Sequence, residues 1–233
     1  MKNIPWATVM PLLMVTLSCT QAQAITITEI SDAGETLNTA QFFPSGSQPL
    51  TAISGRLDGD ADIFKIFLTG GQTFSATTIN LDTIIGIPRD DLLGYPNDLI
   101  PDPQLFLFDE FGKGIYANDD SFSSAQATLP SGGFSPTKSG FYFLDISSSG
   151  YNPVSIGGNI FPTQPSAELF GSTGTGGGFP LNRFQGNSAT SGRYTIALTG
   201  VQSTPIPEPS SILGILAFGI LGIVSRRKRE TSG

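Results

Sequence analysis

Short apolar runs, separated by glycine, proline, serine, threonine and asparagine, fill the sequence from residue 25 to residue 204. No stretch of this region keeps apolar residues at the i, i+3, i+4, i+7 spacing of an amphipathic helix. The runs have the length and the aromatic or β-branched content of strands. The pattern therefore predicts an all-β domain. The predicted strands are Ile25–Ile30, Thr51–Leu57, Asp62–Leu68, Thr73–Ile79, Gln104–Phe108, Gly114–Ala117, Ala125–Leu129, Gly140–Ile146 and Arg193–Gly200.

The predicted strands are of two kinds. In the last one, Tyr194, Ile196 and Leu198 alternate with polar residues, which indicates one buried and one solvent-facing side. Ile63–Leu68 and Phe141–Ile146 are apolar at nearly every position. We expect these two strands to lie at the centre of the domain, where they are covered on both faces or close one end of the core.

Two long connections, residues 81–103 and 147–192, interrupt this pattern. Loops of this length are functional, mobile or contain an overlooked element. Within the second connection we expect short hairpins near Ile156–Phe161 and Ala167–Phe170. The glycine-rich stretch Gly171–Gly178 lacks the Gly-Lys-Ser/Thr ending of a phosphate loop, so we interpret it as a flexible linker or a surface loop.

The first 24 residues are typical of a secretory signal peptide. A short apolar core, Val9–Leu17, precedes the small residues Ala22 and Ala24, which predict cleavage by signal peptidase after Ala24. An uncleaved anchor is disfavoured because the apolar run is far shorter than the ~20 residues of a spanning helix. A lipoprotein processed at Cys19 is a further alternative, although the residues before Cys19 fit that processing poorly.

The other end of the sequence contains three successive features. Pro207, Glu208 and Pro209 are followed by the apolar run Ile212–Val224, which is about 20 Å long as a helix. This length is marginal for a ~30 Å hydrocarbon core. We predict a single transmembrane helix over residues 211–225. A cluster of basic residues follows it and favours a cytoplasmic location for this end, with the bulk of the chain outside: Arg226, Arg227, Lys228 and Arg229.

This order of motif, short helix and basic cluster resembles the PEP-CTERM sorting tail of exopolysaccharide-producing bacteria, here over residues 205–233. The resemblance implies that an exosortase recognises the tail and removes it. The protein would then be anchored in the membrane only transiently and be delivered to the cell surface or the extracellular matrix. The alternative is an ordinary anchor that is never cut, for which the Pro-Glu-Pro motif has no use.

Composition narrows the possible functions. The chain has no histidine, which excludes His-dependent hydrolases and His-containing zinc sites. Its one cysteine lies in the predicted signal peptide, so the mature domain cannot depend on disulfides. Residues 25–207 contain 7 Lys and Arg against 17 Asp and Glu, a net charge of 7 − 17 = −10. Such a domain lacks the clustered cations that binding to nucleic acid requires.

Three segments within residues 54–201 resemble a bacterial pre-peptidase C-terminal (PPC) domain. They are GDADIFKIFLTGGQTFSATT, DPQLFLFDEFGKGIYANDDS, and SGFYFLDISS with the closing SGRYTIALTG. The resemblance implies a jelly-roll-like antiparallel β-sandwich. Members of that family bind polymers, assist secretion or bind calcium, and they are not catalytic. The long connection 147–192 departs from the compact family pattern.

Two groups of oxygen-bearing residues next to predicted strands are candidate calcium ligands. Calcium takes six to eight hard oxygen ligands, which flexible acidic loops can supply. The residues do not follow the EF-hand pattern, and Asp and Asn also gather in turns because they hydrogen-bond nearby backbone. No other cofactor is expected. The candidate ligands are Asp58, Asp60 and Asp62 in the first group and Asn118, Asp119 and Asp120 in the second.

These features together predict a non-enzymatic exported protein of the cell surface or extracellular matrix, associated with exopolysaccharide. A first alternative is a carbohydrate-binding module with a definite sugar site. A second is a glycosidase whose two carboxylates would be a pair such as Asp60 and Asp119. A third, an ice-binding surface, would need a threonine ladder, of which only Thr26 and Thr28 are present. The first alternative predicts that four aromatic residues are exposed and stack on sugars, although aromatic residues in such numbers usually belong to a core: Tyr95, Tyr116, Tyr151 and Phe179.

Overall fold

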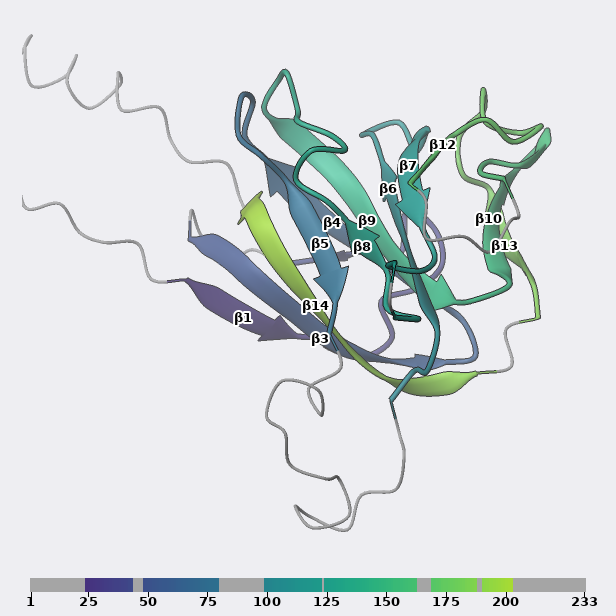
Figure 1. Cartoon of the computed structure of the whole chain (residues 1–233), viewed down its shortest axis with the longest axis horizontal. Helices are drawn as coiled ribbons and strands as arrows, with labels where there is room; N and C mark the ends of the chain where they lie inside the picture. The colour runs from purple at the N-terminus through teal and green to yellow at the C-terminus, as the bar shows by residue number, and fades with distance from the viewer. Residues whose placement is uncertain are drawn as a thin grey trace, which may run out of the picture.

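The computed structural model describes residues 24–43, 48–79, 99–122, 124–162, 169–187 and 190–202. Within these ranges the regular structure is all-β and contains no helix (Figure 1). The described residues accordingly include no helix of the length and apolarity needed to cross a membrane. The predicted signal peptide, Pro-Glu-Pro motif, transmembrane helix and basic cluster lie outside the described residues.

Fourteen strands are formed by the described residues. In chain order they are β1 (Ile25–Thr28), β2 (Gln41–Phe42), β3 (Pro49–Asp58), β4 (Ala61–Leu68), β5 (Ser75–Thr78), β6 (Pro103–Phe108), β7 (Gly114–Asn118), β8 (Thr128–Leu129), β9 (Gly140–Ser148), β10 (Tyr151–Ser155), β11 (Gly158–Asn159), β12 (Phe170–Gly171), β13 (Arg183–Gly186) and β14 (Ser191–Gln202).

Eleven of these strands belong to one mixed sheet. Its main path is β1-β3-β14-β4-β9-β6-β7-β12, while β2 pairs with β4 and β5 pairs with both β14 and β8. The pairs β1–β3 and β2–β4 are parallel, and the other pairs are antiparallel. The remaining three strands form a small separate sheet in the order β11-β10-β13.

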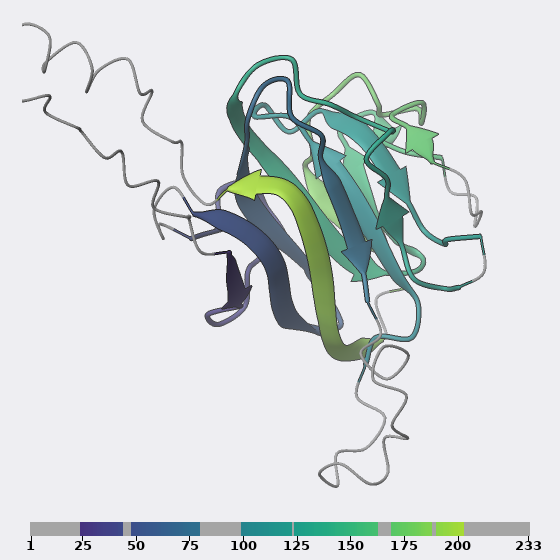
Figure 2. The same cartoon turned by 60° about the vertical axis from the view of Figure 1, so that its left-hand side comes forward.

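Strand β14 connects two layers of the large sheet. It pairs first with β3, then with β5, and its last residues, Val201 and Gln202, pair with β4. A register shift between Ala197 and Val201 accompanies the bend, which Figure 2 shows in the yellow-green strand. The group β3, β14, β5 and β8 thereby faces the group β4, β9, β6 and β7, an arrangement that fits a β-sandwich.

The main hydrophobic core fills the space between these two layers. Phe64 on β4, Leu107 on β6 and Ile53 on β3 are fully or almost fully buried in it. On β14 the side chains of Tyr194, Ile196 and Leu198 are buried while the residues between them are not, so the predicted alternation is confirmed. We call the side of β4, β9 and β6 that faces this core the inner face.

The opposite side of the same strands, which we call the outer face, carries a second hydrophobic cluster. Ile63 on β4, Phe106 on β6 and Phe143 on β9 pack there against Ile160 and Phe184 from the region of residues 151–187. That region includes the small sheet, seen beside β6 and β7 in Figure 1. The expectation that β4 and β9 are covered on both faces is confirmed.

All of the predicted strands overlap an observed strand, but the interpretation of residues 147–192 as a connection was wrong in part. Four short strands, β10 to β13, lie in it. A hairpin of β10 and β11 is present near the first predicted position, with its first strand five residues earlier than expected. Near the second, β12 pairs with β7, and residues 163–168 lie outside the described residues.

The stretch Gly171–Gly178 is an ordered surface loop, which is the second of the two predicted alternatives; the first, a flexible linker, was wrong. The backbone N–H of Gly174 donates to the carbonyl of Ile160 at 3.0 Å, and that of Gly176 donates to the carbonyl of Asn159 at 2.8 Å. A Cβ at Gly174, Gly176 or Gly177 would overlap a backbone carbonyl. The glycines are therefore needed for close backbone packing.

Candidate acidic sites at one end of the sheet

The first predicted calcium group lies at the hairpin between β3 and β4. Asp58 ends β3, Asp60 lies in the turn and Asp62 is the second residue of β4. Gly59 has φ of 90°, a conformation that favours glycine and reverses the chain. On one continuous strand the three carboxylates would share a face and repel one another. The turn instead places Asp58 and Asp62 on two different strands.

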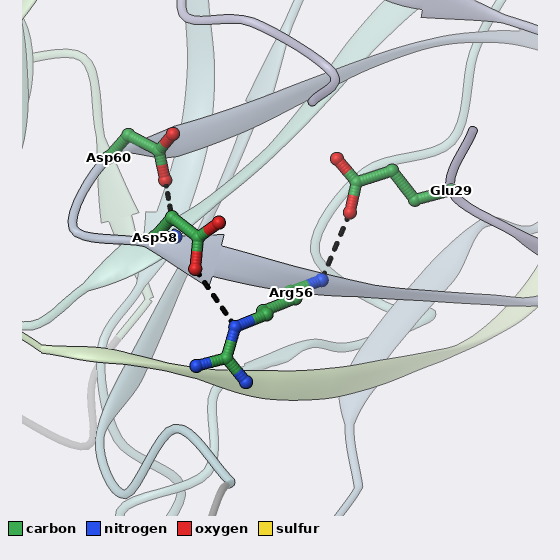
Figure 3. Close-up of polar contacts among 4 residues, drawn as sticks. All are labelled: Glu29, Arg56, Asp58 and Asp60. Carbon is green, nitrogen blue, oxygen red and sulfur yellow. Dashed lines mark hydrogen bonds and ion pairs between the residues drawn. The ribbon is translucent and has the colours of Figure 1, made fainter. Parts of the chain in front are cut away.

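Two of these carboxylates, those of Asp58 and Asp60, have structural partners. Arg56 Nε donates to Asp58 Oδ1 at 2.9 Å, and the backbone N–H of Asp58 donates to Asp60 Oδ1 at 2.8 Å (Figure 3). Both contacts stabilise the turn, in the way that Asp side chains commonly do. The side chain of Asp58 remains largely exposed.

Two carboxylates that the sequence analysis did not single out join this hairpin from the N-terminal segment. Parallel pairing of β1 with β3 brings Glu29 beside the backbone of Arg56, whose N–H donates to Glu29 Oε2 at 3.0 Å. Glu29 Oε1 accepts from the backbone N–H of Ala33 at 2.8 Å. Glu29, Asp32 and Asp62 each place one carboxylate oxygen within 4.8 Å of the others. We call these three residues the hairpin acidic cluster.

Asp62 is the buried member of the hairpin acidic cluster, with 1% of its surface exposed. The Tyr194 hydroxyl donates to Asp62 Oδ2 at 2.6 Å, whereas Asp62 Oδ1 has no hydrogen-bond partner among the described residues. Burial, together with the negative charges of Glu29 and Asp60, raises the pKa of Asp62 to about 8. Burial also raises the pKa of Glu29 and of Asp60. A bound cation would offset this accumulated negative charge.

The second predicted group lies where β6 begins and β7 ends. Asp119 and Asp120 directly follow β7, and Asp102 directly precedes β6. Antiparallel pairing of β6 with β7 brings these two ends together. Asp102, Asp119 and Asp120 each place one carboxylate oxygen within 4.8 Å of the others, and we call them the second acidic cluster. Asp102 had not been predicted.

Asn118, also predicted as a ligand, makes structural hydrogen bonds instead. Its Nδ2 donates to the carbonyl of Asp120 at 2.8 Å, and its Oδ1 accepts from the N–H of Thr128 at 2.7 Å. Burial, together with the charges of Asp102 and Asp120, raises the pKa of Asp119 to about 6. Asn118 thus holds the loop that presents Asp119 and Asp120.

The two clusters lie at the same end of the sheet but do not form one site. Asp62, Ile146, Leu105 and Asn118 are successive partners in one row across β4, β9, β6 and β7. Three inter-strand steps of ~4.8 Å separate the ends of this row by roughly 14 Å. The six predicted ligands are therefore divided between two places.

The same spacing bears on the glycosidase hypothesis. Asp60 precedes β4 by one residue and Asp119 directly follows β7, so they lie near opposite ends of this row. The carboxyl groups of glycosidases are ~5 Å apart in retaining enzymes and ~6.5–9.5 Å apart in inverting ones. The wider strand spacing does not favour Asp60 and Asp119 as such a pair.

The predicted sugar-stacking aromatics do not form one platform. Tyr116 is 4% exposed and belongs to the main core, so its prediction as an exposed residue was wrong. Tyr151 is half-buried, and its hydroxyl donates to Glu35 Oε1 at 2.8 Å. Phe179 is 45% exposed. Tyr95 lies outside the described residues.

A cavity of about 230 Å³ adjoins the second acidic cluster. It lies on the outer face, between β6 and β7 on one side and the segment after β9 on the other. Polar and aromatic side chains both contribute to its wall, among them Gln104, Asp119, Asn152, Phe161 and Phe170. The cavity thus offers hydrogen-bonding groups together with apolar surface.

Comparison with known proteins identifies the tail. Residues 205–229 match the family of the PEP-CTERM protein-sorting motif, so the predicted sorting tail is confirmed over this range. This motif indicates exosortase-dependent sorting of an exported protein to the cell surface. No curated protein and no solved structure matches the chain. The resemblance of the body to a PPC domain stays a prediction.

Proposed function

We propose that this chain is a non-enzymatic protein of the cell surface or extracellular matrix that associates with exopolysaccharide. Its ectodomain, residues 25–204, is a jelly-roll-like β-sandwich of the PPC type. The observation that carries the proposal is the PEP-CTERM match at residues 205–229, which follows an all-β body. An all-β body with two hydrophobic clusters supports a stable domain outside the cell that needs no disulfide.

The proposed route to the surface has three steps. Signal peptidase cuts after Ala24, and the helix of residues 211–225 then halts export. The basic cluster that begins at Arg226 stays in the cytoplasm because cationic flanks resist translocation. An exosortase next cuts beside Glu208 on the external side of this membrane and releases or transfers the ectodomain.

The mass of the intact protein recovered from outside the cells tests this route. We expect the wild-type protein to begin at Ile25 and to lack the basic cluster. The variant Glu208→Ala should remain in the membrane fraction with residues 226–229 still attached. Glu230→Ala, outside the matched motif, serves as the control and should be processed normally. Wild-type protein outside the cell that still ends at Gly233 would contradict the proposal.

Within this function we propose that the hairpin acidic cluster binds a calcium ion that ties the N-terminal segment to the β3–β4 hairpin. Glu29, Asp32 and Asp62 provide oxygen ligands, and Asp60 lies close enough to raise the pKa of Asp62. A cavity of about 250 Å³ beside Glu29, Asp32 and Asp60 leaves room for the ion's water ligands. The ion would stabilise the domain, because it binds only the folded arrangement.

Thermal unfolding of the full chain with calcium and with chelator tests this ion. Calcium at 100 times its dissociation constant would stabilise the fold by about 2.7 kcal/mol. The variant Glu29→Gln/Asp32→Asn should lose most of this gain. Glu110→Gln removes an exposed charge at the opposite end of β6 and β7, and it should retain the gain. Equal melting temperatures with and without calcium would remove this site.

A carbohydrate-binding module is the second candidate, and the mixed polar and aromatic cavity favours it. Sugars bind through hydroxyl hydrogen bonds combined with apolar contact to aromatic rings, and this wall supplies both. Asn152→Ala should weaken retention on the organism's own exopolysaccharide, whereas Gln72→Ala, at an exposed position that does not line this cavity, should not. Equal retention of the two variants would dismiss a definite sugar site here.

A further inference from the structure

We propose that the second acidic cluster is a divalent-cation site of its own, in which Asp102, Asp119 and Asp120 act together with the side-chain carbonyl of Gln104. This site goes beyond the proposed function, because it lies three strands from the hairpin acidic cluster and shares no residue with it. The ligand it would take is a hard cation that prefers oxygen.

The first argument is an excess of buried acceptors over donors. Asp102 Oδ1, Asp119 Oδ1 and Gln104 Oε1 are buried and have no hydrogen-bond partner among the described residues. Asp119 is 6% exposed and Gln104 is 8% exposed, so more than nine-tenths of each side chain is removed from solvent. Acceptors left in this state cost roughly 1–3 kcal/mol each. One cation could coordinate all three.

The second argument is that Gln104 points to a ligand independently of the carboxylates. Gln104 and Asp119 line the same cavity. The side-chain carbonyl oxygen of Gln104, Oε1, is buried in this wall and has no hydrogen-bond partner among the described residues. A neutral carbonyl oxygen has no reason to lie unpaired beside carboxylates unless a donor or a cation lies between them.

The third argument is that the surrounding backbone holds the oxygens in place. The N–H of Ser149 donates to the carbonyl of Asp102 at 2.8 Å, and Ser149 Oγ donates to Asp119 Oδ2 at 3.4 Å. Asn118 fixes the carbonyl of Asp120 from the other side. These contacts leave one oxygen of Asp102 and one of Asp119 unpaired. A site that is already ordered binds its ion without a large entropic cost.

The donor set selects calcium among the common divalent ions. All of the proposed ligands are oxygens, and the whole chain contains no histidine. Calcium accepts six to eight oxygens in flexible geometry, while magnesium demands a near-ideal octahedron. The adjoining cavity of about 230 Å³ leaves space for water molecules or ligand hydroxyls to complete the coordination. Three carboxylates also exceed the double positive charge, which favours tight binding.

Calorimetric titration of the chelator-treated full chain with calcium chloride tests the proposal. Asp102→Asn/Asp120→Asn keeps the size of both side chains and removes two ligand charges. We expect it to weaken binding at this site by at least about tenfold, because ligand charge sets calcium affinity. Glu29→Gln/Asp32→Asn should leave this site intact, and Glu110→Gln should leave all binding intact. Near-UV circular dichroism of each apo variant checks that it folds.

The outcomes separate this site from the calcium site of the proposed function. If Asp102→Asn/Asp120→Asn loses one binding step, the second site is supported. This holds whether or not Glu29→Gln/Asp32→Asn loses a step of its own. Binding that only Glu29→Gln/Asp32→Asn removes, or no binding at all, overturns it. Manganese-soaked crystals of the full chain should show an anomalous peak within coordination distance of Asp119. A peak found only beside Asp62 also overturns the second site.

Discussion

The two faces of β4, β9 and β6 are built from the same strands but are covered in different ways. The inner face is closed by regular strands, β3, β14 and β5, and its side chains are almost all apolar. The outer face is closed by four short strands and by loops that run through residues 151–187. The core on the inner face is therefore formed by strands with regular alternation of apolar and polar residues. The cluster on the outer face depends instead on closely packed loops and short strands.

On β9 the two faces also differ in their ionisable residues. The outer face contains an aspartate, whereas the inner face of this strand has no acidic or basic residue. Alternation along this strand places Asp145 on the same face as Phe143. Asp145 is fully buried, and neither of its carboxylate oxygens has a partner among the described residues. Burial raises its pKa well above the ordinary value. The outer face therefore includes a carboxyl group whose burial favours its neutral form.

We expect the largest difference in stability between the two faces when one phenylalanine on each face is truncated to alanine. Phe64 on the inner face stacks on Phe43 with 5.9 Å between ring centroids, and Phe184 packs on Tyr151 at 5.6 Å over the outer face. Phe64→Ala should reduce the free energy of unfolding by about 3–5 kcal/mol. Phe184→Ala should instead open the small sheet locally, because, within the described part of the chain, no strand of that sheet pairs with a strand of the large sheet.

Hydrogen exchange measures the difference between these two variants. In Phe184→Ala, we expect the amides of β10 and β13 to lose protection while those of β3 and β14 keep it. In Phe64→Ala, protection should fall throughout the domain. Equal loss of protection in both layers of Phe184→Ala would show that the two faces form one cooperative unit, which would remove the distinction.

The next effect concerns the glycine-rich loop over the outer face. A Cβ at Gly177 would overlap the carbonyl oxygen of Ser172, whereas a Cβ at Gly178 meets no atom within 4 Å. Gly177→Ala should therefore destabilise the domain by about 1–3 kcal/mol, because the backbone must shift. Gly178→Ala is the matched control and should be close to neutral. Denaturant unfolding of the two variants side by side provides the measurement, and similar midpoints would mean that the loop is not tightly packed.

The inner face could be predicted from the sequence because its signal is local. The alternation of Tyr194, Ile196 and Leu198, and the run Ile63–Leu68, which is apolar at nearly every position, indicate burial without knowledge of their partners. The close packing of the glycine-rich loop could not be predicted in this way. Its composition is that of a linker, and the need for Gly177 becomes visible only when the carbonyl of Ser172 lies beside it.

The residues of the candidate acidic sites also differ in whether a local sequence pattern reveals them. Asp62 and Asp119 could be found because acidic residues at the end of a strand are a local pattern. Glu29 could not, because it reaches Asp62 only through the parallel pairing of β1 with β3. Asp102 depends in the same way on the pairing of β6 with β7. Long-range pairing of this kind has no short-range signature.

The buried carboxyl of Asp145 predicts a pH dependence of stability. Because its pKa is raised in the folded state, the folded protein binds more protons than the unfolded one at pH values above the ordinary pKa of 3.8. Stability should therefore fall as the pH rises, with a slope of at most about 1.4 kcal/mol per pH unit for one group. Asp145→Asn cannot ionise and should show a smaller slope.

Unfolding free energies measured between pH 5 and pH 8 with chelator present test this prediction. Asp62 and Asp119, with pKa values raised to about 8 and about 6, contribute slopes of the same sign in both proteins. The difference between wild type and Asp145→Asn therefore isolates Asp145. Parallel curves for the two proteins would show that Asp145 has a partner that keeps it charged.

The smallest effect is expected where the outer face is open to solvent. There Lys65 Nζ lies 4.6 Å from the centroid of the Phe141 ring, which itself packs edge-on against Phe67. Lys65→Gln should cost about 0.5–1 kcal/mol, the range for an exposed cation–π contact. Lys113→Gln, in the exposed turn between β6 and β7, removes the same charge without a ring beneath it. Since both variants increase the net negative charge equally, the difference between their unfolding free energies measures the ring contact. No difference would mean that this end of the outer face is stabilised by apolar packing alone.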